Sequence, residues 1–123
     1  MRILVVEDEE ALSRVLSEKL EHADFDVRVA KDGEKAVPLV KQFHPDLVLL
    51  DLLLPKKLGM DVLEEMKRDS EMKSIPVIII SNLGSDEDIK RALALGAVDY
   101  FVKTQHPLKE IVEKVKKYAS LPK

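Results

Sequence analysis

The chain has 123 residues, of which 46% are apolar and 35% charged, a length and balance typical of one globular domain and too polar for a membrane protein. Its net charge of −3 and the lack of tryptophan leave no basic stripe or aromatic platform for direct binding of nucleic acid. The absence of cysteine excludes disulfide scaffolds and thiolate chemistry. Acids directly follow the first short apolar run, unlike in a signal peptide, so we expect a soluble cytoplasmic protein that does not enter a membrane.

Short apolar segments alternate with helical patterns along the whole chain. Three segments, 3–6, 47–50 and 77–80, are continuously apolar, which is typical of strands buried on both faces of a parallel sheet. Two weaker segments are expected to include an edge strand. In chain order the predicted elements are a strand at 3–6, a helix at 11–20, a strand at 27–30, a helix at 36–43, a strand at 47–50, a helix at 62–66, a strand at 77–80, a helix at 89–93, a strand at 100–102 and a helix at 108–119.

This alternation predicts an α/β fold, a doubly wound (βα)5 arrangement with a five-stranded parallel sheet and right-handed crossovers. No repeat or linker interrupts the chain, so residues 1–123 are expected to form a single domain. Pro38 interrupts the second helical pattern, because it lacks a backbone donor, and it is expected to kink or delay that helix.

Polar side chains follow four of the predicted strands at their carboxyl ends, where open α/β sheets place their sites. Glu7 and Asp8 follow the first strand, Asp51 the third, Ser81 ends the fourth and Lys103 follows the fifth. Acids after the first strand oppose a glycine-rich phosphate cradle of the dinucleotide or P-loop kind. Carboxylates without thiolates suit a hard cation such as Mg²⁺.

Most of these residues, taken alone, have a simple structural explanation. Asp8 fits a helix cap, Ser81 a loop or cap serine and Lys103 a solvated lysine at a strand end. Asp51 could cap the loop at 52–55, but a functional role is favoured there, because a carboxylate beside a buried strand is costly unless it is paired or bound to metal. Their arrival at one edge of the sheet favours a functional site. The histidines share no ligand spacing and are expected at the surface: His22, His44 and His106.

Several motifs occur in a fixed order over essentially the whole chain. They are Glu7-Asp8 after Ile-Leu-Val-Val, Asp51 followed by Pro55 and Gly59, Ser81 after Val-Ile-Ile-Ile, Gly96-Ala97 before the fifth strand, and Tyr100-Phe101-Val102-Lys103. In this order and at these separations, the sequence resembles the receiver domains of two-component response regulators, in particular single-domain regulators of the chemotaxis kind. The resemblance implies a flavodoxin-like fold with strand order 2-1-3-4-5.

The resemblance also implies a chemistry. Asp51 would accept a phosphoryl group from a phosphohistidine on a sensor histidine kinase or a phosphotransfer protein. Asp8 and Asp51 would bind Mg²⁺, with Glu7 acting directly or through water and the Leu53 carbonyl completing the shell. The protein would be a signalling switch that assists its own phosphorylation and dephosphorylation, and not an enzyme acting on other substrates.

The remaining implied roles concern switching. Lys103 would hold a phosphoryl oxygen, Ser81 would donate its hydroxyl to the phosphoryl group, and Tyr100 resembles the switch aromatic of the family. The output would be a change on the face built from the fourth helix, fifth strand and fifth helix, read by an unidentified downstream protein. We expect a stand-alone receiver, either a monomer or a dimer that forms on phosphorylation.

The sequence departs from the family pattern at three positions. Thr104 replaces the usual proline after the lysine, so we expect a trans peptide bond there, because a cis bond before a residue other than proline costs about 3 kcal/mol. Asn82 is larger and more polar than the usual residue after the serine, which could narrow access of the phosphoryl group. Leu58 stands where an acid is common and could contact a partner.

Three other interpretations are compatible with parts of the sequence. A receiver-like binding module that signals without phosphate is supported only by Thr104 and Asn82. A phosphatase of the haloacid-dehalogenase kind also uses a strand-end aspartate, but Leu53 occupies the position where those enzymes carry a general acid. A flavodoxin-like cofactor binder is opposed by the acids after the first strand.

Overall fold

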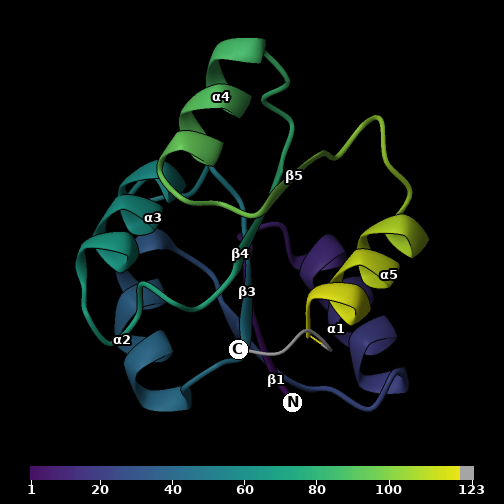
Figure 1. The fold of residues 1–123 in the computed structure, drawn as a ribbon. Helices are drawn as coiled ribbons and strands as arrows, with labels where there is room; N and C mark the ends of the chain where they lie inside the picture. Colours follow the sequence, from purple (N-terminus) through teal and green to yellow (C-terminus); the bar gives the residue numbers. More distant parts are fainter. Residues whose placement is uncertain (120–123) are drawn as a thin grey trace.

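The computed structural model describes residues 1–119, which form a five-stranded, wholly parallel sheet in the order β2-β1-β3-β4-β5. The predicted strand order is confirmed, and each predicted strand is present within one residue of its expected ends. Figure 1 shows the strands at the centre of the molecule with helices on both sides. The strands are β1 (Arg2–Val6), β2 (Asp26–Ala30), β3 (Leu47–Leu50), β4 (Val77–Ser81) and β5 (Asp99–Val102).

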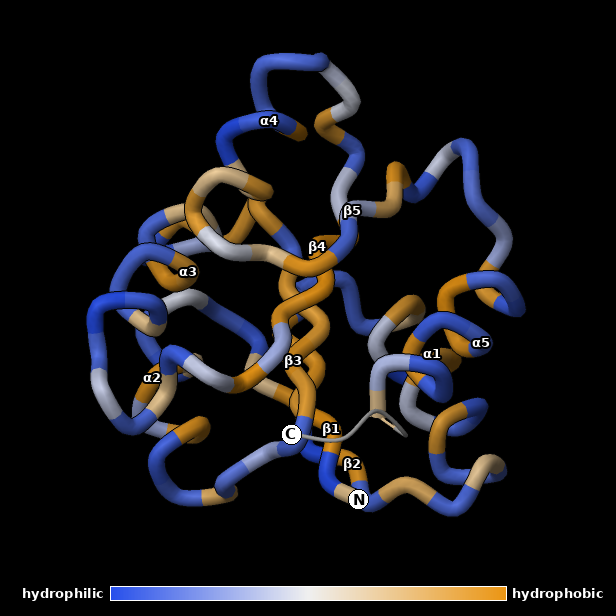
Figure 2. The backbone as a smooth tube through the Cα atoms, viewed as in Figure 1, coloured by the Kyte–Doolittle hydropathy of each residue, from blue (hydrophilic) through white to orange (hydrophobic). Residues whose placement is uncertain are grey.

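Five helices cover the two faces of the sheet, which makes the fold doubly wound as predicted. One apolar core lies between the sheet and α2, α3 and α4, and a second lies between the sheet and α1 and α5. In Figure 2 the central strands are mostly orange, for hydrophobic residues, and the helices on either side alternate between orange and blue. None of the helices within residues 1–119 could cross a membrane. The helices are α1 (Glu10–His22), α2 (Gly33–Phe43), α3 (Gly59–Arg68), α4 (Asp86–Ala94) and α5 (Leu108–Ala119).

The burial of the strands explains their sequences. β3 and β4 lie inside the sheet and are buried at every position, and β1 is buried from its second residue onward. Such strands need apolar side chains on both faces, which accounts for their lack of alternation. The two weaker segments, β2 and β5, are the two edges, as expected. β2 is the more exposed of the two because only Ala30 is fully buried.

Some helical positions differ from the sequence prediction. Val15 and Leu93, both expected on core-facing stripes, are 38% and 45% exposed because the stripes that reach the sheet are narrower than the apolar pattern. The expected delay of α2 by Pro38 is wrong, since the helix begins at Gly33 and continues past the proline to Phe43. Asp32 fixes this start by accepting a hydrogen bond of 2.9 Å from the Lys35 backbone N–H.

Two glycines allow close backbone contacts with the segment that follows β3. A Cβ atom on Gly59 would lie 2.0 Å from the Asp51 carbonyl oxygen, and one on Gly33 would lie 1.8 Å from the Lys57 carbonyl oxygen. The Gly59 N–H donates a 3.0 Å hydrogen bond to the Leu52 carbonyl. Because the first turn of α3 rests directly on the end of β3, the backbone at Asp51 is held by a contact that only glycine allows.

We therefore expect Gly59→Ala to destabilise the protein by roughly 2 kcal/mol or more, because backbone atoms must move to admit the methyl group. Gly84→Ala is the matched control, since its Cβ would meet only the Val102 side chain at 3.4 Å and the free energy of unfolding should change by less than about 1 kcal/mol. Urea unfolding of both variants measures the difference. Equal stability of the two variants would contradict the close-contact argument.

Candidate functional site

Three carboxylates meet at the carboxyl edge of the sheet. Val6 of β1 pairs with Leu50 of β3, so Glu7 and Asp51 are the next residues on neighbouring strands, and Asp8 follows Glu7. One carboxylate oxygen from each of the three lies within 4.8 Å of the other two. Glu7 and Asp51 are buried, whereas Asp8 is exposed at the rim. The structure thus brings together the three acids that the sequence predicted for one site.

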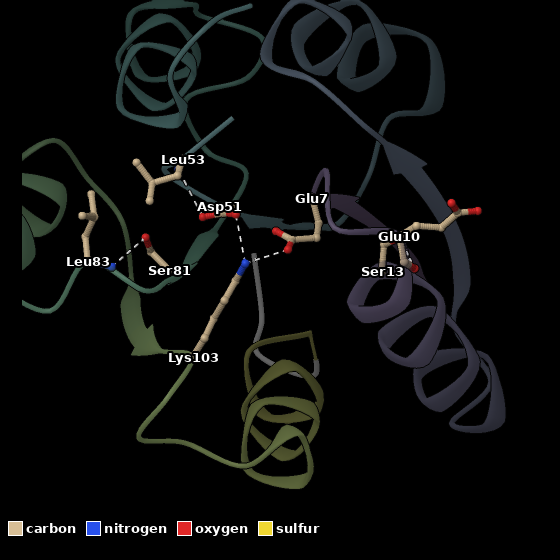
Figure 3. A network of polar contacts seen from close by, with 8 residues as sticks. All are labelled: Glu7, Glu10, Ser13, Asp51, Leu53, Ser81, Leu83 and Lys103. Carbon is tan, nitrogen blue, oxygen red and sulfur yellow. Dashed lines mark hydrogen bonds and ion pairs between the residues drawn. The ribbon is translucent and has the colours of Figure 1, made fainter. Parts of the chain in front are cut away.

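Lys103 reaches this cluster from the far side of β4. Its ammonium lies 2.6 Å from Glu7 Oε1 and 3.0 Å from Asp51 Oδ2, and Figure 3 shows it between the two carboxylates. Burial acts to lower the pKa of this ammonium, but the hydrogen bonds to Glu7 and Asp51 outweigh burial and raise it. One cation therefore faces three acids, which leaves an excess of negative charge at the site.

The pKa of Glu7 shows how unfavourable a further negative charge is at this buried site. Burial of its carboxyl group is the largest of the effects that raise its pKa to about 8, and the hydrogen bond with Asp51 adds to it. Its Oε2 atom is buried and has no hydrogen-bond partner. An unsatisfied buried carboxylate oxygen beside two further carboxylates fits a hard divalent cation, which prefers oxygen ligands. These residues therefore suit Mg²⁺.

The loop after β3 completes the surroundings of Asp51. The Leu53 backbone N–H donates a 3.1 Å hydrogen bond to Asp51 Oδ1, so both carboxylate oxygens of Asp51 are engaged. The Leu53 side chain is 48% exposed, and no acid from this position faces Asp51. The backbone of Leu53 is thus adjacent to the acidic cluster, where its carbonyl was expected to contribute.

Ser81 and Tyr100 meet through the loop that follows β4. The Ser81 side chain is fully buried, and its Oγ accepts a 3.2 Å hydrogen bond from the Leu83 N–H. The Tyr100 hydroxyl donates to the carbonyl of the same leucine. Burial raises the pKa of the Tyr100 hydroxyl. Tyr100 is buried, with 9% of its surface exposed, and Leu83 packs against the apolar cluster to which Tyr100 belongs.

The backbone of Leu83 is a contact that sequence analysis missed. Both of its polar groups are used, the N–H by Ser81 and the C=O by Tyr100. No side-chain pattern marks such a position, since the interactions belong to the main chain. The fold alone reveals it.

The departures from the family pattern all lie near the site. Thr104, Asn82 and Leu58 are exposed, and Leu58 is the residue immediately before α3. Residues 1–119 contain no cis peptide bond, so the Lys103–Thr104 bond is trans as expected.

The three histidines do not gather at a metal site. His22 and His44 are exposed, as predicted. His106 is an exception to the surface prediction, because it is only partly exposed and its ring packs edge-on against Phe101, with 5.1 Å between ring centroids. Its Nδ1 atom lies 3.2 Å from the Val102 nitrogen and 3.1 Å from the Val102 oxygen.

The chain belongs to the response regulator receiver domain family, whose model matches residues 3–116. Receiver domains of this family are signalling switches of two-component systems; phosphorylation and an acidic Mg²⁺ site are typical of them, and they interact with histidine kinases or phosphotransfer proteins. The assignment agrees with the fold and with the acidic cluster described above.

Curated relatives are longer proteins. The chain is 41% identical over 102 residues to the DNA-binding dual master transcriptional regulator RpaA of Synechocystis, a match covering 83% of this chain and 42% of that protein. It is 39% identical over 115 residues to the phosphate regulon transcriptional regulatory protein PhoB of Escherichia coli, covering 94% of this chain and 50% of that protein. The chain thus spans about half the length of the curated relatives it matches.

Solved structures in different states resemble this one. The BeF3-activated receiver domain of Klebsiella pneumoniae RstA has a TM-score of 0.90 at 28% identity, covering 98% of this chain and 100% of that one. The non-phosphorylated HemR receiver domain of Leptospira biflexa also has a TM-score of 0.90, at 33% identity, covering 99% and 96%. The Mn²⁺-bound response regulator Rcp1 has a TM-score of 0.82 at 32% identity, covering 98% and 92%. Equal similarity to activated and non-phosphorylated receivers shows that the overall fold does not distinguish the two states.

The raised pKa of Glu7 predicts a pH dependence of stability in metal-free protein. Folded protein keeps a proton on Glu7 that the unfolded chain releases above about pH 4.5, so stability falls as the pH rises from there towards 8. Glu7→Gln removes this proton linkage, so its unfolding free energy relative to wild type should increase across that range. Urea unfolding in EDTA at several pH values measures it. Glu18→Gln, at an exposed position of α1, is the control, and a Glu7→Gln difference independent of pH would contradict the prediction.

Proposed function

We propose that residues 1–123 act as one receiver domain in the cytoplasm, in which Asp51 accepts a phosphoryl group from a histidine kinase or a phosphotransfer protein. The observation that carries this proposal is the burial of Asp51 at the end of β3, beside two further acids and within 3.0 Å of the Lys103 ammonium. A nucleophilic carboxylate next to a fixed cation and a divalent-ion site is the arrangement that phosphoryl transfer to aspartate requires.

The acidic cluster would hold Mg²⁺ through Asp8, Asp51 and Glu7, with the Leu53 carbonyl as a further ligand. The cation would supply positive charge to the phosphoryl oxygens, which carry most of the charge in the transition state. The unpartnered Oε2 of Glu7 supports this assignment, because a bound cation would satisfy it. Asp8 is the exposed member of the cluster, so its carboxylate is the one in contact with solvent.

Phosphoryl transfer would proceed by attack of an Asp51 carboxylate oxygen on phosphorus. The new P–O bond forms as the P–N bond to the donor histidine breaks, and the bonding electron pair returns to the imidazole nitrogen. Lys103 would exchange its contact with Asp51 Oδ2 for a contact with a phosphoryl oxygen, where negative charge then lies. No acid stands at Leu53 to protonate a leaving group, which supports a switch rather than an enzyme with other substrates.

The switch would involve the loop between β4 and α4. Ser81 would donate its hydroxyl to the phosphoryl group, and rotation of its side chain toward that group would break the hydrogen bond that its Oγ now accepts from the Leu83 N–H. Because Tyr100 is bonded to the same leucine, any movement of the loop reaches β5. The face of α4, β5 and α5 would then change for a downstream protein, with or without dimerisation.

One observation favours a second candidate, a receiver that binds its partner without phosphorylation. Tyr100 is already buried and hydrogen-bonded to Leu83 in the absence of a phosphoryl group. If this contact is the signalling one, phosphorylation would change partner binding little. The acids and the lysine of the site would then have no part in signalling by phosphoryl transfer.

Intact mass after incubation with acetyl phosphate tests the phosphoacceptor. Wild type with Mg²⁺ should gain one phosphoryl group, and Asp51→Asn should gain none, because the amide is not a nucleophile at phosphorus. Asp61→Asn, at an exposed position in the first turn of α3, is the matched control and should behave like wild type. No adduct on folded wild type under any condition would overturn the proposal and favour the phosphorylation-independent receiver.

Calorimetric titration with Mg²⁺ tests the metal ligands. Asp8→Asn removes one of the three carboxylates and should weaken Mg²⁺ binding by at least about tenfold. Glu9→Gln, at the exposed position next to Asp8 and outside the cluster, should leave the affinity within about twofold of wild type. Equal losses in the two variants would indicate diffuse attraction to an acidic surface rather than a metal site.

A further inference from the structure

The outer edge of β2 has no neighbouring strand within residues 1–119. β2 pairs with β1 on one side only, and Figure 2 shows β2 and β5 at opposite ends of the row of strands. The Asp26 N–H and the Ala30 C=O are both hydrogen-bonded toward β1. Because successive residues of a strand direct their backbone groups to opposite sides, those of Val27 and Val29 point outward and can pair with a further strand.

The two faces of β2 differ in character. Val27 and Val29 are half-buried against the core under α1 and α5, whereas Asp26 and Arg28 are exposed on the other face. The Arg28 guanidinium stands 5.1 Å from the centroid of the Phe43 ring at the end of α2. In the part of the chain that the structure describes, neither Asp26 nor Arg28 has an ion-pair partner. The edge therefore presents one acid and one base, two positions apart, to an outside partner.

A polar hollow of about 290 Å³ lies beside this edge, lined by Arg2, Asp26, Arg28, Gln42 and Phe43. Two guanidinium groups share it with one carboxylate, so it can take up one further carboxylate. The nearby Asp46 is already engaged, because it accepts a 2.8 Å hydrogen bond from the Arg2 backbone N–H. The hollow is thus suited to an acidic side chain that arrives along the edge of β2.

We propose that the edge of β2 is an interface between two copies of this chain, whose β2 strands pair in antiparallel orientation about a two-fold axis at Val27. Val27 exchanges both backbone hydrogen bonds with its counterpart. The Val29 N–H of each copy donates to the Phe25 carbonyl of the other, while the Phe25 N–H keeps its 3.1 Å bond to the Leu20 carbonyl. On the exposed face, Asp26 of each copy lies opposite Arg28 of the second copy.

The backbone and the charges together select this register. An antiparallel ladder must place the outward residues Val27 and Val29 at hydrogen-bonded positions. A two-fold axis at Arg28 meets this condition but brings two arginines together, and an axis at Val29 places Arg28 opposite Ala30. Only the axis at Val27 sets each arginine opposite an aspartate, at the positions where side chains of paired strands lie closest.

A second copy fits this edge because the edge is complementary to itself. A two-fold rotation exchanges the acid with the base, and on the other face it brings Phe25 against Val29 and Val27 against Val27 of the second copy. Charges on an edge strand usually prevent pairing. Here they oppose the other registers and favour one.

The contact is small and separate from the phosphoacceptor. One short strand from each copy buries much less than the roughly 1,200–2,000 Å² of stable complexes, so the dimer is weak. β2 and β5 are the two opposite edges of the sheet, so the dimer leaves the face of α4, β5 and α5 free. Pairing through β2 does not depend on phosphoryl transfer to Asp51.

Sedimentation equilibrium of the full chain from about 10 μM to about 1 mM tests the interface. Wild type should show a dimer fraction that rises with concentration. Arg28→Glu and Asp26→Arg each set like charges opposite each other and should weaken dimerisation at least about tenfold. Lys73→Glu, an equal charge change at an exposed position outside β2, should stay within about threefold of wild type. Circular dichroism confirms that the variants fold.

An equimolar mixture of Arg28→Glu and Asp26→Arg gives a sharper test. In the mixed pair, each acid of one chain lies opposite a base of the other. A heterodimer about as strong as the wild-type dimer should therefore form from two variants that are separately monomeric.

Because the chain has no cysteine, a single introduced cysteine reports the register. Val27→Cys places two thiols across the axis, with Cα atoms about 5.5 Å apart, which is within disulfide range. Val29→Cys places them more than about 10 Å apart. Mild oxidation should therefore give a covalent dimer of Val27→Cys and none of Val29→Cys.

The outcomes decide for or against the interface. Wild type that stays monomeric at about 1 mM, single charge variants that dimerise like wild type, or a mixture that forms no heterodimer would each overturn it. A covalent dimer of Val29→Cys in place of Val27→Cys would overturn the proposed axis. Asp51→Asn should dimerise like wild type, which distinguishes failure of this proposal from failure of the phosphoacceptor.

Discussion

The contact of the Lys103 ammonium with Glu7 and Asp51 is the interaction on which the site depends. Two buried carboxylates one position beyond paired residues of β1 and β3 would repel each other strongly in an apolar surrounding, and a single cation is shared between them. The neutralisation is incomplete, because Glu7 keeps an oxygen without a partner and its pKa is raised to about 8. The site therefore keeps an excess of negative charge, which a divalent cation would offset.

Backbone contacts transmit the geometry of this site to the rest of the molecule. Gly59 lets α3 rest on the carbonyl of Asp51, so the end of β3 cannot shift without moving the helix. On the other side, Ser81 and Tyr100 both use the backbone of Leu83. A change in the hydrogen bond of Ser81 thus has a direct route to β5. Contacts of main-chain atoms therefore link the acidic site to α3 and to β5. Main-chain chemistry is nearly the same in every sequence.

The similarity of the fold to both an activated and a non-phosphorylated receiver means that the overall fold does not assign a state to this structure. The burial of Tyr100 and the exposure of Asn82 and Leu58 are local features.

The sequence by itself determined the fold class, the strand positions and the residues that meet at the carboxyl edge, because continuous apolar strands force a parallel sheet and the residues after them must share one edge. It also marked Asp51 through the cost of placing a carboxylate there. Only the tertiary structure decided that Lys103 contacts both Glu7 and Asp51, that the Tyr100 hydroxyl bonds to the Leu83 carbonyl, and that α2 accommodates Pro38. These outcomes depend on distances between segments far apart in the chain and on main-chain partners such as Leu83, which local residue patterns do not encode.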